Sequence, residues 1–171
     1  MALTYKLINK ISLLSNTATI SFTSIPSDYT DLILLCSMRS DRSGSSIDNV
    51  RLKINNLSSG YSEVTGSLFN SSISNNSASS LTQTIPIFCT ASSAPSGYYS
   101  NSETTIFNYS LIQEKSISSV SVTGGSSNSN ILLFAGLLSN TAIINSIELS
   151  PVLGTNFITG SSAFLYGVTK I

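Results

Sequence analysis

The stretch TATISFTSIPSDYTDLILLCSMRSDRSGSSIDNVRLKIN (residues 17–55) decides the fold class. Its apolar residues recur at every second position, which is the period of a β-strand with one buried face and not the period of a helix. A Pro-Ser-Asp turn and a Gly-containing loop separate three such runs. The residues expected to face the core are Ala18, Ile20 and Phe22 in the first run, Leu32, Leu34, Cys36 and Met38 in the second, and Val50, Leu52 and Ile54 in the third.

The rest of the chain repeats this alternation between segments rich in Ser, Asn and Gly. The run ILLFAGLL (131–138) is predicted to be a strand rather than a helix, because it is short and contains a glycine. Pro86 has no backbone N–H to donate, so its strand is predicted to lie at a sheet edge. Residues 71–80 and 90–102 are predicted to be polar loops. The ten predicted strands span residues 17–24, 30–40, 48–55, 63–70, 81–89, 103–112, 116–123, 131–138, 143–149 and 162–170.

About ten strands without alternating helices predict an all-β fold, either a two-sheet antiparallel β-sandwich or a barrel, with no substantial helix. The composition is continuous, so we expect residues 1–171 to form a single β-sandwich domain. Residues 124–127 (GGSS) are predicted to be a flexible hairpin connection. In the predicted strand 103–112, the residues expected to share one face are Thr105, Phe107, Tyr109 and Leu111.

The composition argues against several classes of function. The chain has no histidine, which is the commonest general base and zinc ligand. Eight basic residues balance eight acidic ones, which argues against a nucleic-acid partner. The chain has neither 18 consecutive apolar residues nor a signal-peptide pattern, so no membrane partner is predicted. Cys36 and Cys89 lie in apolar runs and are expected to be buried free thiols, with a disulfide as the alternative.

Charged residues are few and unevenly placed. They make up 9% of the chain, and residues 64–102 and 116–147 contain none, whereas a soluble domain usually carries about a quarter. Strand faces coated with Ser and Thr can lie against another protein without desolvating ions. We therefore expect much of the surface to be covered permanently by copies of the chain or by a scaffold. The alternative is a Ser-rich surface exposed to water.

Two carboxylate pairs, Asp28 with Asp31 and Asp41 with Asp48, have the residue type that glycosidases use. Aspartate also caps turns, and we interpret these residues as structural. The loop 41–48 is rich in oxygen atoms but lacks the spacing and the terminal glutamate of a calcium loop. We therefore predict no catalytic, cofactor-binding or metal-binding residues, and no enzymatic activity.

Two local groups of side chains have more specific interpretations. Arg39, Asp41 and Arg42 are predicted to form an ion-pair network at a strand end. Tyr98 and Tyr99 lie in a Ser-, Gly- and Pro-containing loop, where exposed aromatic rings can stack on sugars. We favour an ordinary loop or a subunit contact over a sugar site at this position.

Two segments resemble a β-rich family that is common in tailed bacteriophages. Residues 22–55 carry the pattern F-x-x-I-P-x-x-Y-x-D-L, then a strand, then S-x-R-S-D-R before a second strand that ends in I-N. Residues 132–171 carry SNTA before an I-x-L strand, an Asn-Phe pair and a final strand with LYG. Leu138 stands where relatives often have Trp. The resemblance covers a little under half of the chain.

The resemblance implies a virion structural protein with a jelly-roll-like sandwich, often in trimers. Its partners would be itself, as a homotrimer, and another virion protein such as the major capsid protein. Capsid decoration or a head fibre is the favoured role. The alternative is a tail-fibre or receptor-binding module that recognises host surface glycans through residues 91–101. The implied local roles are that Tyr29 and Leu32 anchor a turn on the core, that Arg39, Asp41 and Arg42 order a loop, and that Phe157, Phe164, Leu165 and Tyr166 close the sandwich.

Overall fold

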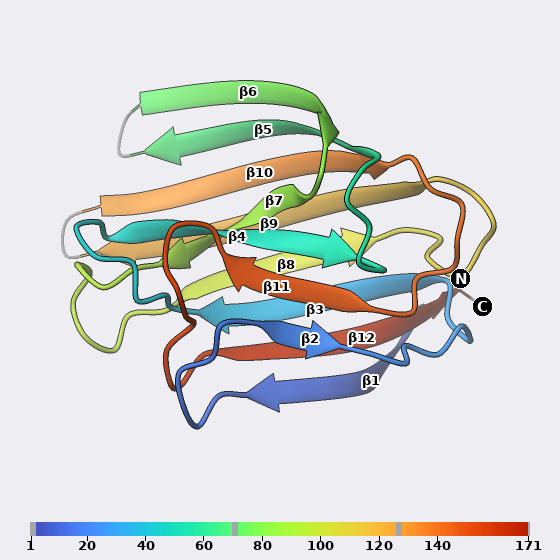
Figure 1. Ribbon diagram of the computed structural model, residues 1–171, viewed down its shortest axis with the longest axis horizontal. Helices are drawn as coiled ribbons and strands as arrows, with labels where there is room; N and C mark the ends of the chain where they lie inside the picture. Colours follow the sequence, from blue (N-terminus) through green and yellow to red (C-terminus); the bar gives the residue numbers. More distant parts are fainter. Residues whose placement is uncertain (1–2, 70–71, 126–127, 171) are drawn as a thin grey trace.

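The structure is a computed structural model that describes residues 3–69, 72–125 and 128–170. These residues form twelve β-strands and no helix, in two antiparallel sheets (Figure 1). The all-β class and the two-sheet sandwich predicted from the sequence are thus confirmed. The strands are β1 (Leu3–Ser12), β2 (Ile20–Phe22), β3 (Asp31–Met38), β4 (Ile47–Ile54), β5 (Tyr61–Phe69), β6 (Ser72–Leu81), β7 (Thr84–Thr90), β8 (Ser100–Ile106), β9 (Lys115–Gly125), β10 (Asn128–Leu138), β11 (Ile147–Pro151) and β12 (Ser162–Lys170).

Eight of the strands have the connectivity of a jelly roll. The pairs β1–β12, β2–β11, β3–β8 and β4–β7 form one long antiparallel ribbon. This ribbon rolls up so that β12 also pairs with β3, and β11 also pairs with β4. The outcome is two four-stranded layers, β1-β12-β3-β8 and β2-β11-β4-β7, as in double-sheet jelly rolls.

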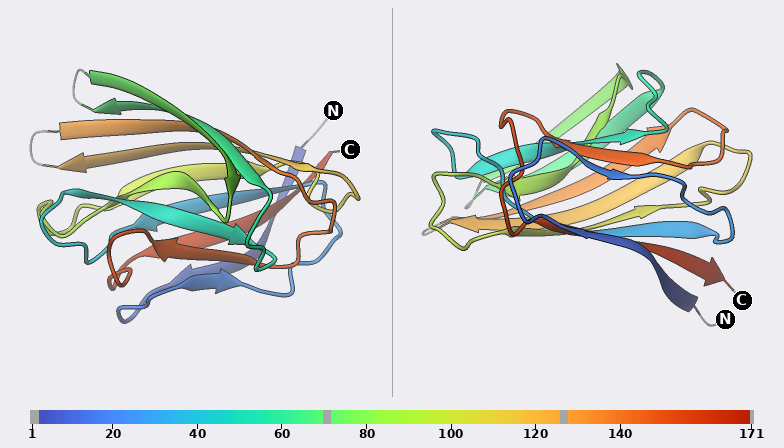
Figure 2. Two further views of the ribbon diagram at one scale, coloured as in Figure 1. Left: turned by 45° about the horizontal axis from the view of Figure 1, so that its top comes forward. Right: turned by 60° about the horizontal axis from the view of Figure 1, so that its bottom comes forward.

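Two hairpins widen one of these layers. Across the larger sheet, β9 and β10 lie next to β8, and β5 and β6 lie beyond β10. The sheet therefore has the order β1-β12-β3-β8-β9-β10-β5-β6. The smaller sheet remains β2-β11-β4-β7. The β5–β6 hairpin lies at one edge of the molecule, beyond the strands of the smaller sheet (Figures 1 and 2).

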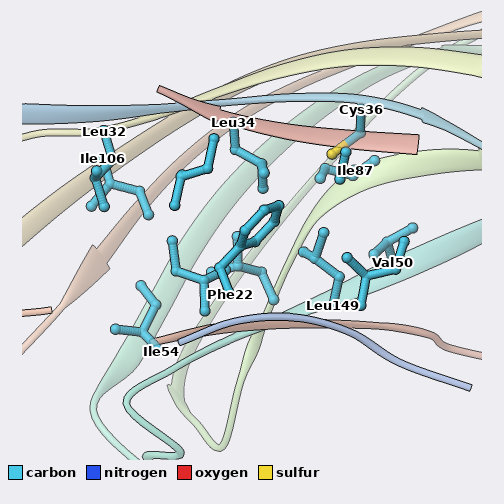
Figure 3. Close-up of a cluster of buried hydrophobic side chains, with 14 of the residues drawn as sticks. Phe22, Leu32, Leu34, Cys36, Val50, Ile54, Ile87, Ile106 and Leu149 are labelled. Carbon is cyan, nitrogen blue, oxygen red and sulfur yellow. The ribbon is translucent and has the colours of Figure 1, made fainter. Parts of the chain in front are cut away.

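The core lies between the two layers and is built by the alternation that the sequence predicts. The inward residues of β3, β4 and β2 are 5% exposed or less, while their neighbours in sequence are more accessible. Figure 3 shows Phe22 from β2 between the inward side chains of both sheets. Burying such side chains is the main favourable contribution to folding. The labelled members of this cluster are Phe22, Leu32, Leu34, Cys36, Val50, Ile54, Ile87, Ile106 and Leu149.

The turn implied by the resemblance is anchored on the core. Leu32 is fully buried, and the ring of Tyr29 covers Gly167, where an added Cβ would lie 2.2 Å from the ring. The hydroxyl of the buried Tyr109 donates to the carbonyl of Pro26 and accepts from the Tyr29 N–H at 3.4 Å. These contacts agree with the anchoring role expected for Tyr29 and Leu32.

Pro86 lies in β7, which pairs only with β4 among the described strands, so the predicted edge position is confirmed. The predicted strand at 131–138 is also confirmed, as the greater part of β10. Of the predicted connection at 124–127, Gly124 and Gly125 instead belong to β9 and pair with Ser129 and Asn128 of β10, and residues 126–127 fall outside the described residues.

Several predictions at the level of single elements are wrong. Residues 72–80, which belong to the loop predicted at 71–80, lie in β6, and residues 3–12 form β1, so the described residues form twelve strands and not ten. Strand β2 begins only at Ile20, and Ala18 is exposed. Strand β8 ends at Ile106, so Phe107, Tyr109 and Leu111, predicted to share a strand face with Thr105, lie beyond it; its buried face consists of Ser100, Ser102, Thr104 and Ile106.

Candidate interaction surface

The outward face of the larger sheet is wide, apolar and almost without charge. We call it the outer sheet face and define it as the outward side chains of β12, β3, β8, β9, β10, β5 and β6. Cross-strand pairing arranges these side chains in three rows. The first row is Phe164, Leu35, Glu103, Val120, Leu133, Gly66 and Asn75; the second is Tyr166, Ile33, Thr105, Ser118, Ala135, Val64 and Ser77; the third is Ser162, Ser37, Asn101, Val122, Ile131, Leu68 and Ile73.

Large apolar side chains in these rows remain in contact with solvent. Val120 is 50% exposed, Leu133 is 56% exposed and Ile73 is 84% exposed. Glu103 is the one charged residue in the three rows, and Lys10 lies beside Phe164 on β1. At a strand spacing of about 4.8 Å and a same-face residue spacing of about 6.7 Å, the rows cover on the order of 500 Å² in projection. Twelve of the twenty-one positions in the rows are apolar, and the largest apolar patch on a protein surface is often a site of interaction with another molecule.

The middle of the outer sheet face is hollowed into a groove of about 890 Å³. Small residues such as Thr105 and Ser118 occupy its centre, while Phe164 and Tyr166 stand at one side and Leu133 at the other. This arrangement corrects the role implied for Phe164 and Tyr166. Because successive side chains of β12 point to opposite faces, Leu165 closes the core, whereas its two neighbours line the groove.

Phe157 has the buried position that the resemblance implies. It is fully buried outside the named strands, and it forms single β-bridges with Thr17 and Ser40.

A second group of polar residues orders the loops at one end of the sandwich. Arg39 is 6% exposed, and its guanidinium donates to four backbone carbonyls of the loop after β7. The carbonyls of Ala94 and Pro95 accept at 2.7 and 2.6 Å, and those of Ser92 and Tyr98 accept at 3.1 Å. Arg39 thus holds residues 92–98 in one conformation.

Asp41 and Asp48 bind the backbone of residues 153–156. The carboxylate of Asp41 accepts from the Thr155 N–H at 2.7 Å and from the N–H and side-chain amide of Asn156. The fully buried Asp48 accepts from the Gly154 N–H at 2.9 Å and from the Leu153 N–H at 3.2 Å. Both carboxylates therefore serve to fix a loop.

The predicted ion-pair network does not form. Arg42 donates to the Ile47 carbonyl at 2.8 Å, Arg39 donates to carbonyls, and Asp41 accepts from amides. The loop-ordering role implied for these three residues is supported, but through backbone hydrogen bonds, which residue type alone could not reveal. Burial works to raise the pKa of Asp41, and the hydrogen bonds from Asn156 and Thr155 outweigh it, so that the pKa lies below its usual value.

The two tyrosines of the predicted sugar loop have different surroundings. Tyr99 donates its hydroxyl to the Thr159 carbonyl at 2.7 Å and packs against Gly160. Tyr98 is 49% exposed. The loop therefore presents one free aromatic ring rather than a pair.

Cys36 and Cys89 are free, buried thiols, as expected from the apolar runs in which they lie. Burial raises the pKa of the Cys36 thiol to about 12. Burial also raises the pKa of Cys89, and the nearby charge of Asp48 adds to this effect.

Neither protein-family models, nor curated protein sequences, nor solved structures yield a match to this chain. Within residues 3–69, 72–125 and 128–170, no three acidic or thiol side chains gather in a way that would hold a metal ion. The same part of the chain contains no helix that is long and apolar enough to cross a membrane.

Proposed function

We propose that the protein is a non-enzymatic structural component on the outside of a tailed-phage virion, most specifically a capsid decoration or head-fibre protein. The observation that carries the proposal is the outer sheet face, a broad apolar surface with one carboxylate on a jelly-roll scaffold. Such a surface suits permanent contact with protein, because apolar area is buried without removing charges from water.

The proposed contact is between copies of the chain. Leu35, Val120 and Leu133 lie in one row near the centre of the sheet, so copies that meet through this row bury the most apolar area. A homotrimer, as the resemblance implies, would direct this face of each copy toward a common axis. The loops and the smaller sheet would then be free to contact another virion protein, such as the major capsid protein.

The backbone contacts of Arg39, Asp41 and Asp48 support a structural rather than a catalytic role for the charged residues of the loops. The carboxylates bind backbone N–H groups and the guanidinium binds carbonyls, so each has partners that fix chain geometry. We therefore propose no enzymatic activity, no cofactor and no nucleic-acid partner.

The direct test is to image virions of the phage that encodes the protein after labelling with an antibody against it. Label over the head supports capsid decoration. Label at the tail supports the second candidate, a tail-fibre or receptor-binding module, which is favoured by the exposed Tyr98 in the loop ordered by Arg39. A glycan array with the purified protein, and with the Tyr98→Ala variant as control, tests sugar recognition. Virions without any label would refute both roles.

A further inference from the structure

The two sheets have four edge strands, and three of them carry features that hinder pairing with another chain. An edge strand presents unpaired N–H and C=O groups, which charged side chains, prolines, bulges and short length protect. Strand β1 carries Lys6 and Lys10 and has a bulge between Leu7 and Asn9. Strand β2 has three residues.

Strand β7 is protected by its sequence and by its neighbours. Pro86 removes one donor from this edge. The N–H of Phe88 donates to the Ser121 hydroxyl at 2.9 Å, and the N–H of Ile85 donates to the Glu63 carboxylate at 3.1 Å. Donors that would otherwise be offered to another strand are thus satisfied within the chain.

Strand β6 carries one of these protections, a bulge between Ala78 and Leu81, and this bulge lies at the end of the strand. The strand is ten residues long, SISNNSASSL, with no charge and no proline. Its one strand neighbour among the described residues is β5, and the pairing is regular from Ser72 to Ala78. Eight of its ten residues are exposed. A long, uncharged and exposed edge of this kind is a template for strand addition.

We propose that β6 pairs in antiparallel fashion with β6 of a second copy of this chain, joining two larger sheets into one continuous sheet. The side chains of β6 indicate that the partner strand is β6 of a second copy. About a two-fold axis each residue near the centre meets itself or a close neighbour, so a charged residue would face its own charge. Ser and Asn side chains both donate and accept hydrogen bonds, so Ser74, Asn75 and Asn76 can pair with their own copies.

The regular segment sets the register of this pairing. Its central residue is Asn75, which lies opposite Asn75 of the second copy when the two-fold axis passes through it. Ile73 then faces Ser77, and Ser74 faces Asn76. Because residues that face each other in an antiparallel pair point to the same side of the sheet, the outer sheet faces of the two copies become one surface.

This edge contact is independent of the proposed virion role and of the proposed trimer contact. A three-fold contact through the outer sheet face and a two-fold contact through β6 generate a closed assembly of six copies when the two axes cross at a right angle. Each contact fails separately. Without the edge pair the assembly is a trimer, and without the face contact it is a dimer. The mass of each species is the corresponding multiple of the chain mass of 18.1 kDa.

The first test is disulfide crosslinking at the proposed two-fold axis. Facing residues of an antiparallel pair have Cα atoms about 4.5–5.5 Å apart, which suits a disulfide. We expect the Asn75→Cys variant to form a covalent dimer under mild oxidation, since Cys36 and Cys89 are buried. Asn9→Cys on the exposed, lysine-bearing edge β1 is the matched control. If Ser74→Cys, Asn75→Cys and Asn76→Cys all crosslink no faster than the control, the proposal is overturned.

The second test is the effect of charge on the assembly, measured by light scattering after size-exclusion chromatography. We expect Asn75→Asp to weaken association by at least about tenfold, and Asn9→Asp to leave it unchanged. Mixing the Asn75→Asp and Asn75→Lys variants should restore the edge pair, which a folding defect would not allow. An Asn75→Asp variant with the wild-type mass and dilution behaviour would also overturn the proposal.

Discussion

Replacing Arg39 by Met tests how strongly one buried cation stabilises the loops of the sandwich. Methionine keeps much of the side-chain volume but removes the guanidinium. Four carbonyls, those of Ser92, Ala94, Pro95 and Tyr98, then lose their donor. Because Arg39 is 6% exposed, water does not replace the guanidinium without local opening of the loop.

The magnitude follows from the number and kind of these hydrogen bonds. A hydrogen bond to a charged group contributes about 1.5–3 kcal/mol. The four contributions do not add fully, since the released loop regains water at part of its backbone. We therefore expect a loss of about 3–5 kcal/mol, since a buried acceptor left without a donor costs about 1–3 kcal/mol. For a domain of this size the melting temperature should fall by about 6–20 °C.

The assay is thermal and chemical unfolding at one fixed protein concentration, since self-association stabilises the folded state. Two other arginines serve as matched controls. Arg51 donates to two carbonyls, those of Pro151 and Val152, and Arg42 donates to one, that of Ile47. The expected order of destabilisation is Arg39→Met, then Arg51→Met, then Arg42→Met. An Arg39→Met variant no less stable than Arg42→Met would refute the reasoning.

Three further predictions concern the packing of the core, the stability of the protein at low pH and the reactivity of the thiols. Leu34→Ala should cost about 2–5 kcal/mol in urea unfolding, because Leu34 is fully buried. The exposed Leu14, outside the outer sheet face, is the control, and a loss under about 0.5 kcal/mol at Leu34 would contradict its placement in the core. Asp41 has a lowered folded-state pKa, so its contribution to stability is complete above about pH 4 and is lost as the pH falls through the folded-state value. Asp41→Asn should therefore make the free energy of unfolding less sensitive to acid. A variant that loses stability at low pH as steeply as the wild type would count against this prediction. Cys36, with a pKa raised to about 12, should react with a thiol reagent at pH 8 only after unfolding; rapid labelling of the folded protein would disprove this.

The fold class could be predicted from the sequence because the central strands bury one face. In β3 and β4 the inward positions are apolar except for Asp48 near the start of β4, and period two is visible without the structure. Strand β6 could not be recognised in this way. Neither of its faces is covered by the smaller sheet, so no position had to be apolar, and SISNNSASS has the composition of a loop.

Strand β8 shows a different limit. Its inward positions are mostly hydroxyl residues, and Thr104 shares a hydrogen bond of 2.8 Å with Ser119 inside the sandwich. A buried face made of Ser and Thr has no hydrophobic period, so the strand was predicted at 103–112, later in the sequence than β8. The outer sheet face was hidden for a related reason. Its residues come from seven strands, and only the strand order places Val120 beside Leu133.

The loop network shows what residue types alone can and cannot give. Asp41 and Asp48 were interpreted as structural, and both carboxylates accept hydrogen bonds from backbone N–H groups. Their partners, residues 153–156, are more than a hundred positions away in sequence. No local pattern points to such a partner, and the expected pairing of Arg39 with Asp41 failed for this reason.

The most direct test of the central claim is sedimentation velocity of the wild-type protein beside a variant with Val120→Lys and Leu133→Lys. Both substitutions place charge at the centre of the outer sheet face, on exposed positions that do not affect the core. Ser21→Lys, on the outward face of β2, is the control. The wild type and the control should sediment as a multimer that persists on dilution, and the double variant as a folded species with fewer copies. A wild-type protein that sediments as a single 18.1 kDa chain at all concentrations would contradict the claim.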